Sequence, residues 1–229
     1  MALEPPTKKR KLIWNKISKE GLDLDFTRNF LSEKEADALF DWFEKTVEYF
    51  SGELAQVKIF GKWHKIPRKQ VSYGEEGLSY KFSGNTVPAL PWPDKLAELR
   101  DHLNEVTSNN FNFVLVNRYK DGNDHMGYHR DDEADLESLA PIASISLGQT
   151  RDFVFQHADA RRSGPGKRDV PPVKLSLNHG SLLMMNPPTN RFWYHSLPRR
   201  KNCPGVRINL TFRTMVLKKK QCRNKLQNK

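Results

Sequence analysis

Hydrophobic positions recur at two different spacings along the chain, and each spacing predicts a different kind of element. From Ser32 the apolar residues follow helical spacing, and Ser32 with Glu35 matches the capping-box pattern that begins many helices. A second run of helical spacing begins at about Asp94. The apolar positions are Ala36, Leu39, Phe40, Phe43, Val47 and Phe50 in the first run and Leu96, Leu99, Leu103 and Val106 in the second. We therefore expect two helices, each packing one apolar face against a core.

Most other apolar residues occur in short runs bounded by glycine, proline, asparagine or aspartate, which is typical of strands. Before the second helix, the stretches "AQVKIFGKWHKIP", "QVSYG" and "LSYKFSG" predict hairpins with glycine turns. After residue 110 come "FNFVLVNRY", "IASISLG", "DFVFQH", "VKLSLNHGSLLMMN", "RFWYHSL" and "RINLTFRTMVL". Many short strands at this spacing predict a sandwich or barrel, so the fold class is mainly β with flanking helices.

Charge narrows the choice of partner. The 229 residues include 38 Lys and Arg against 27 Asp and Glu, which gives a net charge of +11 and favours a polyanion such as nucleic acid over a merely soluble basic protein. Lys8, Lys9, Arg10 and Lys11 follow two prolines and predict a nuclear-localisation signal, with a solvated charge run as the alternative. No apolar run is long enough for a membrane span, and two distant cysteines predict a reducing intracellular compartment.

A candidate metal site begins with "HRD". His129 and Asp131 are two residues apart, so in an extended segment both side chains point to the same side, although this spacing alone is weak evidence. The third ligand is predicted to be His195, a lone polar residue in the aromatic run "RFWYHSL". His179 is the competing choice, but its place at a glycine turn favours a structural role. Two histidines and one carboxylate form the facial triad of non-haem iron oxygenases, with zinc hydrolysis as the rival chemistry.

The stretch "RINLTFR" favours the iron oxygenase chemistry over zinc hydrolysis. Its polar residues alternate with apolar ones, so they share one face of a predicted strand: Arg207, Asn209, Thr211 and Arg213. Arginine binds a carboxylate bidentately, and two arginines beside a metal suit a dicarboxylate keto acid such as 2-oxoglutarate. Asn117 and Tyr119, two residues apart on an earlier strand, could donate hydrogen bonds to the same ligand. A solvated polar strand face is the alternative.

Together, "NRYKDGNDHMGYHRDDE", "GSLLMMNPPTNRFWYHSLP" and "RINLTFR" resemble the AlkB-type Fe(II)/2-oxoglutarate dioxygenases, and the resemblance runs from about residue 20 to 217. It implies a double-stranded β-helix, or jelly roll, at about 110–217, with a nucleotide-recognition lid of β-hairpins at about 53–86. Both belong to a single domain over 16–217, between basic tails at 1–15 and 218–229. The resemblance implies Fe(II) on His129, Asp131 and His195. It places 2-oxoglutarate, with O2 as the other co-substrate, on Asn117, Tyr119, Arg207, Thr211 and Arg213, with Asn209 on the same face.

The resemblance also implies a reaction. It is oxidative dealkylation of N-alkylated bases, of the 1-methyladenine and 3-methylcytosine type, in DNA and preferably in duplex DNA, with release of formaldehyde and succinate. The protein is expected to act as a monomer and to flip the damaged base out of the stack. Phe60, at a hairpin tip among cations, is interpreted as the wedge that enters the duplex, with a satellite core residue as the alternative.

Further substrate contacts are predicted around that wedge. They are Gly61, Lys62, Arg68, Tyr80, Lys81, Phe82, Asp132, Arg199, Arg200 and Lys201. Tyr80 and Phe82 share one strand face and could stack on a base, although a plain apolar strand face is the alternative. The basic residues among them are expected to meet phosphates. Asp132 is out of phase with the metal pair, so the resemblance suggests that it contacts the substrate base.

Two residues depart from the family pattern. A bulky Tyr128 directly precedes His129, and Pro188 doubles the proline at 187. Two alternative functions stay open at this point. One is the same chemistry on single-stranded DNA, RNA or protein, and the other is a non-catalytic nucleic-acid-binding jelly roll. The complete triad and both arginines argue against the second, because a binding module needs no oxidant.

Overall fold

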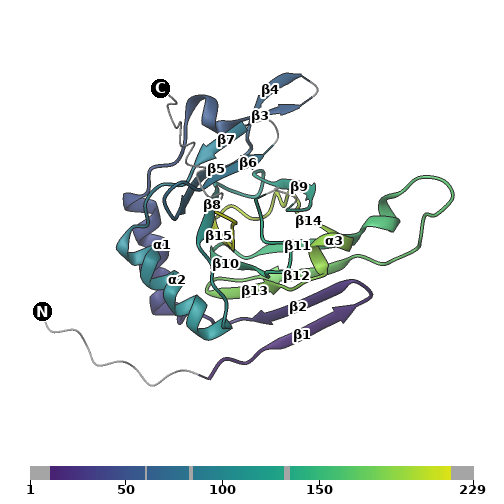
Figure 1. Ribbon diagram of the computed structural model, residues 1–229, viewed down its shortest axis with the longest axis horizontal. Helices are drawn as coiled ribbons and strands as arrows, with labels where there is room; N and C mark the ends of the chain where they lie inside the picture. Colours follow the sequence, from purple (N-terminus) through teal and green to yellow (C-terminus); the bar gives the residue numbers. More distant parts are fainter. Residues whose placement is uncertain (1–10, 60, 83–84, 132–134, 218–229) are drawn as a thin grey trace, which may run out of the picture.

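The computed structural model describes residues 11–59, 61–82, 85–131 and 135–217 (Figure 1). The C-terminal tail predicted at 218–229 lies outside the described residues, as do Lys8, Lys9 and Arg10 of the predicted nuclear signal. Lys11 is described and is exposed. Within the described part of the chain, no helix is both long enough and apolar enough to cross a membrane.

Two antiparallel sheets form the body of the molecule. In spatial order, the large sheet consists of β1 (Asn15–Lys19), β2 (Leu22–Thr27), β13 (Ser181–Met185), β10 (Ile142–Gly148), β15 (Arg207–Arg213), β8 (Phe113–Tyr119) and β5 (Lys69–Gly74). The small sheet consists of β12 (Val173–Leu177), β11 (Arg151–His157), β14 (Trp193–Leu197) and β9 (Met126–His129). Leu183 and Met185 of the large sheet share a buried cluster with Phe155 and Trp193 of the small one. The predicted jelly-roll core agrees with this face-to-face packing.

Two helices cover the outer face of the large sheet, α1 (Glu33–Thr46) and α2 (Asp94–Thr107) (Figure 1). The predicted capping box is confirmed: the Ser32 hydroxyl accepts the Glu35 N–H (3.2 Å), and the Glu35 carboxylate accepts the Ser32 N–H (2.7 Å). The helix is shorter than the apolar pattern, because Val47 is already extended at the C-cap, but Val47 and Phe50 still pack against the core. Both apolar stripes are buried in the largest hydrophobic cluster, as predicted.

Two hairpins stand at one end of the sandwich. One pairs β3 (Gln56–Ile59) with β4 (Lys62–Lys65), and the other pairs β6 (Ser79–Phe82) with β7 (Asn85–Pro88) (Figure 1). Gly61 at the first turn has φ +80°, in the left-handed region that favours glycine. The hairpin predicted for "QVSYG" is wrong, since this stretch is β5, which pairs with β8 in the large sheet and is buried on both faces. The range 53–86 therefore contains two hairpins and one strand of the main sheet.

Three short helical segments complete the described structure: η1 (Gly52–Ala55), η2 (Ala158–Arg161) and α3 (Thr189–Phe192). The last of these was expected to be part of a strand, which instead begins at Trp193. Its position just before β14 becomes important at the metal site.

Candidate metal centre and active-site pocket

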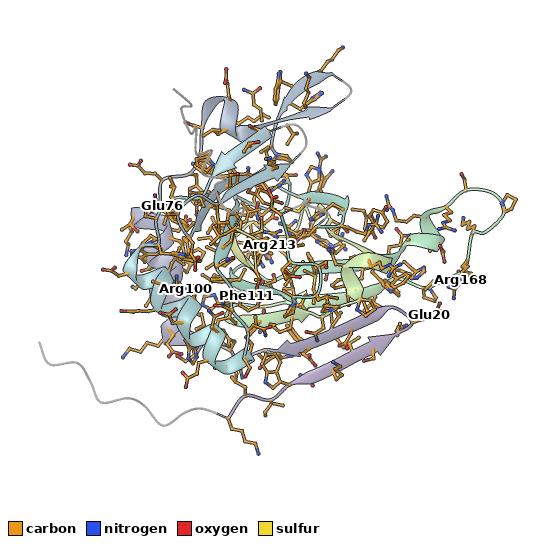
Figure 2. The ribbon with its side chains drawn as sticks, viewed as in Figure 1. Glu20, Glu76, Arg100, Phe111, Arg168 and Arg213 are labelled. Atoms are coloured by element: carbon orange, nitrogen blue, oxygen red, sulfur yellow. The ribbon has the colours of Figure 1, made fainter. Side chains whose placement is uncertain are left out.

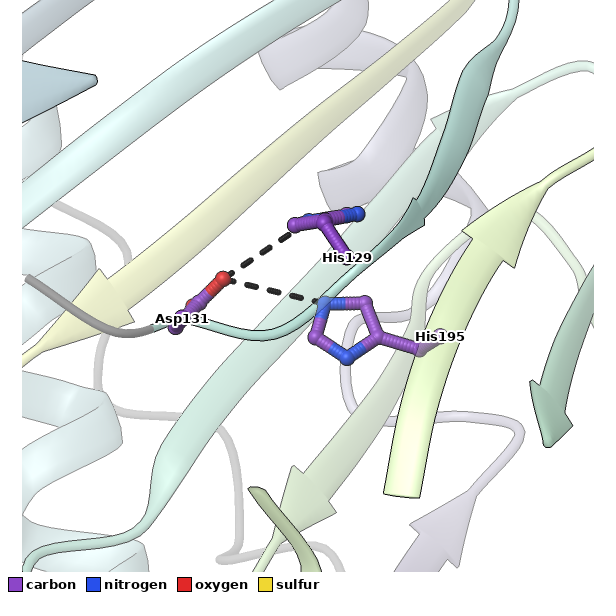
Figure 3. Close-up of side chains that lie close together, drawn as sticks. All are labelled: His129, Asp131 and His195. Atoms are coloured by element: carbon purple, nitrogen blue, oxygen red, sulfur yellow. Dashed lines mark ion pairs between the residues drawn. The ribbon is translucent and has the colours of Figure 1, made fainter. Parts of the chain in front are cut away.

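The three predicted metal ligands come together between the two sheets (Figure 3). Strand β9 ends at His129, strand β14 carries His195, and these two residues are direct partners in the pairing of the strands. Their ring centroids are 4.2 Å apart. Asp131, two residues beyond His129, places Oδ1 3.7 Å from Nε2 of each histidine. One donor atom from each residue thus lies within 4.8 Å of the others.

The two imidazoles have the protonation state that a metal ligand needs. Burial lowers the pKa of His195 to about 3, and it lowers the pKa of His129 too, although that side chain is 33% exposed toward the pocket. Both rings are therefore neutral at neutral pH. The His129 Nδ1 lies 3.0 Å from the Gly127 carbonyl oxygen, which can only accept, so Nδ1 carries the proton. The lone pair of Nε2 is then free to face Asp131 and an ion.

Asp131 is buried and is held on two sides. Its Oδ2 accepts hydrogen bonds from Nε (2.9 Å) and Nη2 (2.6 Å) of Arg213, which lies at the centre of the molecule (Figure 2). Burial, the largest single influence, acts to raise the pKa of the carboxyl, but the charge and hydrogen bond of Arg213 together with the two histidines outweigh it, and the pKa is lowered. Asn190 of α3 accepts the Asp131 N–H (3.0 Å) and donates to the Asp131 carbonyl. An ionised carboxylate with Oδ1 toward two neutral imidazoles fits Fe(II).

The predicted dicarboxylate site also lies in this pocket. All six predicted residues line one cavity of about 680 Å³, which the metal ligands line as well: Asn117, Tyr119, Arg207, Asn209, Thr211 and Arg213. The cavity lies on the face of β8 and β15 that is turned toward the small sheet, with the two hairpins contributing to its wall through Val57, Tyr80 and Lys81. The structure therefore brings together the metal ligands and the polar strand face, which the sequence had predicted from separate motifs.

Arg207 is the part of this face best suited to bind an anion. Its side chain is 1% exposed, its Nη2 donates to Ser146 Oγ (2.9 Å), and its guanidinium lies 5.4 Å from the centre of the Tyr119 ring. Burial lowers its pKa to about 10, which leaves it charged at neutral pH. In the described part of the chain, its Nε has no hydrogen-bond partner and no carboxylate forms an ion pair with it. A buried cation without a counter-ion fits the carboxylate of 2-oxoglutarate.

The other predicted co-substrate residues form hydrogen bonds with protein groups. Asn209 donates to Ser144 Oγ (2.8 Å) and to the Ile145 carbonyl (3.0 Å), and its Oδ1 accepts the Thr211 hydroxyl (3.0 Å). Asn117 Oδ1 accepts Arg68 Nε (2.7 Å). Arg68, predicted as a DNA contact, therefore lines the cavity and orients Asn117. These bonds fix the floor of the cavity before any ligand enters.

The predicted DNA contacts occupy several places. Tyr80 is buried in the cavity wall, stacked on Phe113 at 5.8 Å, and Lys81 is exposed beside it. Gly61, Lys62, Arg199 and Lys201 are exposed, whereas Arg200 is engaged by Asp152 through a 2.6 Å ion pair. Phe60 and Asp132 lie outside the described residues, and of Phe82 only the backbone is described.

His179 has the structural role that its turn predicted. Its Nδ1 accepts the Gly148 N–H (2.7 Å), and its Nε2 lies 3.1 Å from Asp37 Oδ1. Sequence reasoning missed Asn190 and also Gln70, which pairs with Asn117 across β5 and β8 and so points to the same sheet face. The Gln70 side chain is buried, and neither of its polar atoms has a partner among the described residues. No sequence motif marks either residue.

Comparison with known proteins agrees with this geometry. Residues 23–213 match the 2OG-Fe(II) oxygenase superfamily. The chain is 56% identical to the human protein named DNA oxidative demethylase ALKBH2, over 90% of this chain and 78% of the human one. The Arabidopsis thaliana protein of that name is 34% identical, over 86% of this chain and 67% of its own length. Mouse alpha-ketoglutarate-dependent dioxygenase alkB homolog 3 is 38% identical, over 65% of this chain and 52% of its own length.

Among solved structures, OsALKBH1 superposes with a TM-score of 0.58 at 16% identity, over 87% of this chain and all of that one, and thus supports the fold. The superfamily match covers most of the chain, and His129, Asp131 and His195 provide the donor set that its iron needs. The chain therefore belongs to the 2OG-Fe(II) oxygenase superfamily, as an AlkB-type dioxygenase that uses Fe(II) with 2-oxoglutarate and O2 as co-substrates.

Proposed function

We propose that this protein removes alkyl groups from N-alkylated bases of the 1-methyladenine and 3-methylcytosine type in DNA. The observation that supports this most directly is one cavity that combines the metal ligands, the buried cation of Arg207 and the Tyr80 ring. The name of the human relative, DNA oxidative demethylase, supports DNA as the substrate. Iron, when bound, supplies the oxidation of the N-methyl group by O2, coupled to the conversion of 2-oxoglutarate to succinate and CO2. The hydroxymethyl product then releases formaldehyde and restores the base.

The residues of this chain position the reactants. Arg213 holds the Asp131 carboxylate and Asn190 holds the Asp131 backbone. The proposed ligands His129 and His195 lie 3.7 Å from this carboxylate. Arg207 binds a carboxylate of 2-oxoglutarate, with Asn117, Tyr119, Asn209 and Thr211 around it. The Tyr80 ring forms a wall against which a base can stack. Because these groups are fixed by protein hydrogen bonds, little reorganisation is needed when substrate binds.

The preferred substrate is duplex DNA with the damaged base flipped out, bound by a monomer. Lesions that prevent Watson–Crick pairing lower the cost of flipping, which is about a few kcal/mol. The β3–β4 hairpin supports this role, since Lys62 and Lys65 are exposed on β4, which follows the proposed wedge Phe60 in the sequence. Exposed Arg199 and Lys201 are positioned to meet phosphates, and the net charge of +11 favours a polyanion. The basic cluster from Lys8 to Lys11 is proposed to direct the protein to the nucleus.

The test is turnover of an oligonucleotide duplex that carries one 1-methyladenine, with Fe(II), 2-oxoglutarate and O2. We expect equal amounts of succinate, formaldehyde and repaired base, and no product without iron or 2-oxoglutarate. Asp131→Ala should abolish iron binding and turnover but retain affinity for DNA. The absence of succinate and formaldehyde with every alkylated duplex tested would sink the proposal. Loss of duplex repair in Phe60→Ala, with single-strand repair retained, would support the wedge.

A further inference from the structure

Arginine and tyrosine side chains form an alternating stack beside the mouth of the cavity. The guanidinium of Arg130 lies 4.6 Å from the centre of the Tyr194 ring. The guanidinium of Arg161 lies 4.9 Å from the same ring and 4.7 Å from the ring of Tyr128. The order of the stack is therefore Arg130, Tyr194, Arg161 and Tyr128. It ends at Tyr128, one of the two residues that depart from the family pattern.

The pairing of the strands explains where this stack lies. His129 pairs with His195, and His195 pairs with Phe155, so these three side chains point inward toward the metal site. The next pair along these strands is Gln156 with Tyr194, and their side chains point to the opposite face of the small sheet. The register of β9 against β14 shifts between His195 and Leu197, so alternation alone does not place Tyr128. Its contact with Arg161, which also meets the ring of Tyr194, places the Tyr128 ring on that opposite face, away from the metal ligands.

Tyr128 nevertheless reaches the rim of the cavity. It is among the residues that line the cavity, and its side chain is 37% exposed, which makes it one of the large hydrophobic residues exposed in the described structure. Its Cα is about 3.8 Å from that of the metal ligand His129, the distance between consecutive residues. A nucleic-acid substrate with one base inside the cavity must pass its adjacent nucleotides over this rim. The part of the substrate nearest to Tyr128 is thus the nucleotide next to the flipped one.

The stack is anchored at both arginines. Arg161 Nη1 donates to Gln156 Oε1 (3.2 Å), and Arg130 Nη1 donates to the Arg191 carbonyl (2.7 Å). Each guanidinium is therefore held at its edge while its faces meet the rings. A ring held in this way loses little side-chain freedom when a planar ligand stacks on it, so binding is stronger than on a mobile side chain. The two cations also attract the phosphates on either side of such a ligand.

We propose that Tyr128 is a specificity-determining residue that stacks on the nucleobase flanking the alkylated base, with Arg161 and Tyr194 as positioning residues. A nucleobase fits this position because it presents a flat π face between two phosphates, and the rim offers the Tyr128 ring at the end of the stack, with the cation of Arg161 beside it. This inference rests on the proposed function, since it requires a nucleic-acid substrate. Its consequence is that the enzyme distinguishes a lesion inside a strand from a free modified nucleotide.

The experiment compares three substrates that differ only around the lesion. They are 1-methyladenosine 5′-monophosphate, a trinucleotide with 1-methyladenine between two thymidines, and the same trinucleotide with abasic sites in place of both thymines. The third substrate keeps the phosphates and removes the flanking bases. Formaldehyde release gives kcat and KM for the wild type and for Tyr128→Ala, Tyr128→Leu and Tyr128→Phe. Thermal unfolding of each variant, measured in parallel, shows whether the fold is intact.

We expect Tyr128→Ala and Tyr128→Leu to raise KM for the thymidine-flanked trinucleotide by about 5- to 100-fold, the loss of one base–aromatic stack. The KM for the abasic trinucleotide should change by less than about twofold, because no flanking base is there to lose. Tyr128→Phe should restore the wild-type KM, and kcat should change less than KM because the ring lies away from the reacting methyl group. Tyr128→Leu keeps more of the side-chain volume than alanine does and so guards against a packing defect in the alanine variant.

Two results would overturn the inference: an unchanged KM for the flanked trinucleotide, or an equal rise for the flanked and abasic substrates. The second result would mean that Tyr128 acts on the pocket or on the backbone and not on a base. Failure of the proposed function looks different, because the wild-type protein would then release no formaldehyde from any of the three substrates or from an alkylated duplex. The two failures are therefore distinguishable before any variant is compared.

Discussion

Replacing Arg207 by methionine should stabilise the ligand-free protein and abolish its response to 2-oxoglutarate. The guanidinium is 1% exposed and has no carboxylate partner in the described residues, so the empty pocket holds a buried charge that nothing neutralises. Burial lowers its pKa from the ordinary value of an arginine to about 10. At about 1.4 kcal/mol for each tenfold change in proton affinity, this corresponds to roughly 3 kcal/mol of unfavourable free energy.

Removing the charge should stabilise the ligand-free protein, but part of this stabilisation is offset because the arginine side chain also makes favourable contacts. The hydrogen bond from Arg207 to Ser146 contributes about 1 kcal/mol. Methionine is unbranched and fills an irregular space well, so the packing against Tyr119 is largely kept. We therefore expect Arg207→Met to increase the free energy of unfolding of the ligand-free protein by about 1–2 kcal/mol. Arg207→Lys, which keeps a buried charge, is the matched control and should show no such increase.

The assay is urea unfolding of the metal-free protein, with and without 2-oxoglutarate. A ligand at 100 times its Kd stabilises the folded state by about 2.7 kcal/mol, so wild-type protein should gain about that much while Arg207→Met gains nothing. The order of stability should therefore reverse when 2-oxoglutarate is added. A methionine variant that is less stable than wild type without ligand, or equally stabilised by 2-oxoglutarate, would refute the assignment of Arg207 as the carboxylate-binding cation.

Three further substitutions test other parts of the structure. Gln70→Met should raise the free energy of unfolding by about 1 kcal/mol in chemical denaturation, because it removes a buried amide without hydrogen-bond partners; a decrease would mean that the amide is satisfied in solution. Asn190→Ala frees the Asp131 backbone and should weaken Mn(II) binding by about 10- to 100-fold in calorimetry, with unchanged affinity as the contrary result. Gly122→Ala would place a Cβ 1.7 Å from the Arg200 carbonyl oxygen and should lower the melting temperature by at least about 4 °C; a smaller change would show that the 198–203 segment can move.

Local sequence patterns predicted the parts of the fold that depend on local chemistry. The capping box at Ser32 and the pair His129 and Asp131 follow from spacing within a few residues. The N-terminal hairpin was not predicted, although Leu22 and Leu24 alternate with polar residues, because aspartates are rare in strands. The structure gives both aspartates a partner: Lys16, in the same hairpin, forms an ion pair with Asp23, and Asn186, 161 residues away, donates to Asp25 (2.6 Å). The contact with Asn186 cannot be read from a local pattern.

The same limit explains what was missed at the metal site. Arg213 was predicted to bind 2-oxoglutarate, and it lines the cavity, but its contact with Asp131, 82 residues away in sequence, was not predicted. The contact arises because Asp131 follows β9 of the small sheet whereas Arg213 ends β15 of the large one, and only the packing of the sheets brings them together. Asn190 reaches Asp131 from 59 residues away for a related reason. Residue types predicted the ligands, but the groups that orient them required the tertiary structure.

One register, that of β9 against β14, sets both the metal site and the rim of the pocket. The pairing of His129 with His195 directs both imidazoles inward, whereas Tyr128 and Tyr194 lie on the outer face, where both rings meet Arg161. A slip of β9 by one residue would turn Tyr128 into the cavity and remove His129 from it. Asn190 accepts a hydrogen bond from the Asp131 N–H, and Arg130 donates one to the Arg191 carbonyl. Both hydrogen bonds connect the end of β9 to the segment that leads into β14. These two contacts oppose such a slip, so metal binding and the geometry of the substrate opening should change together when either contact is removed.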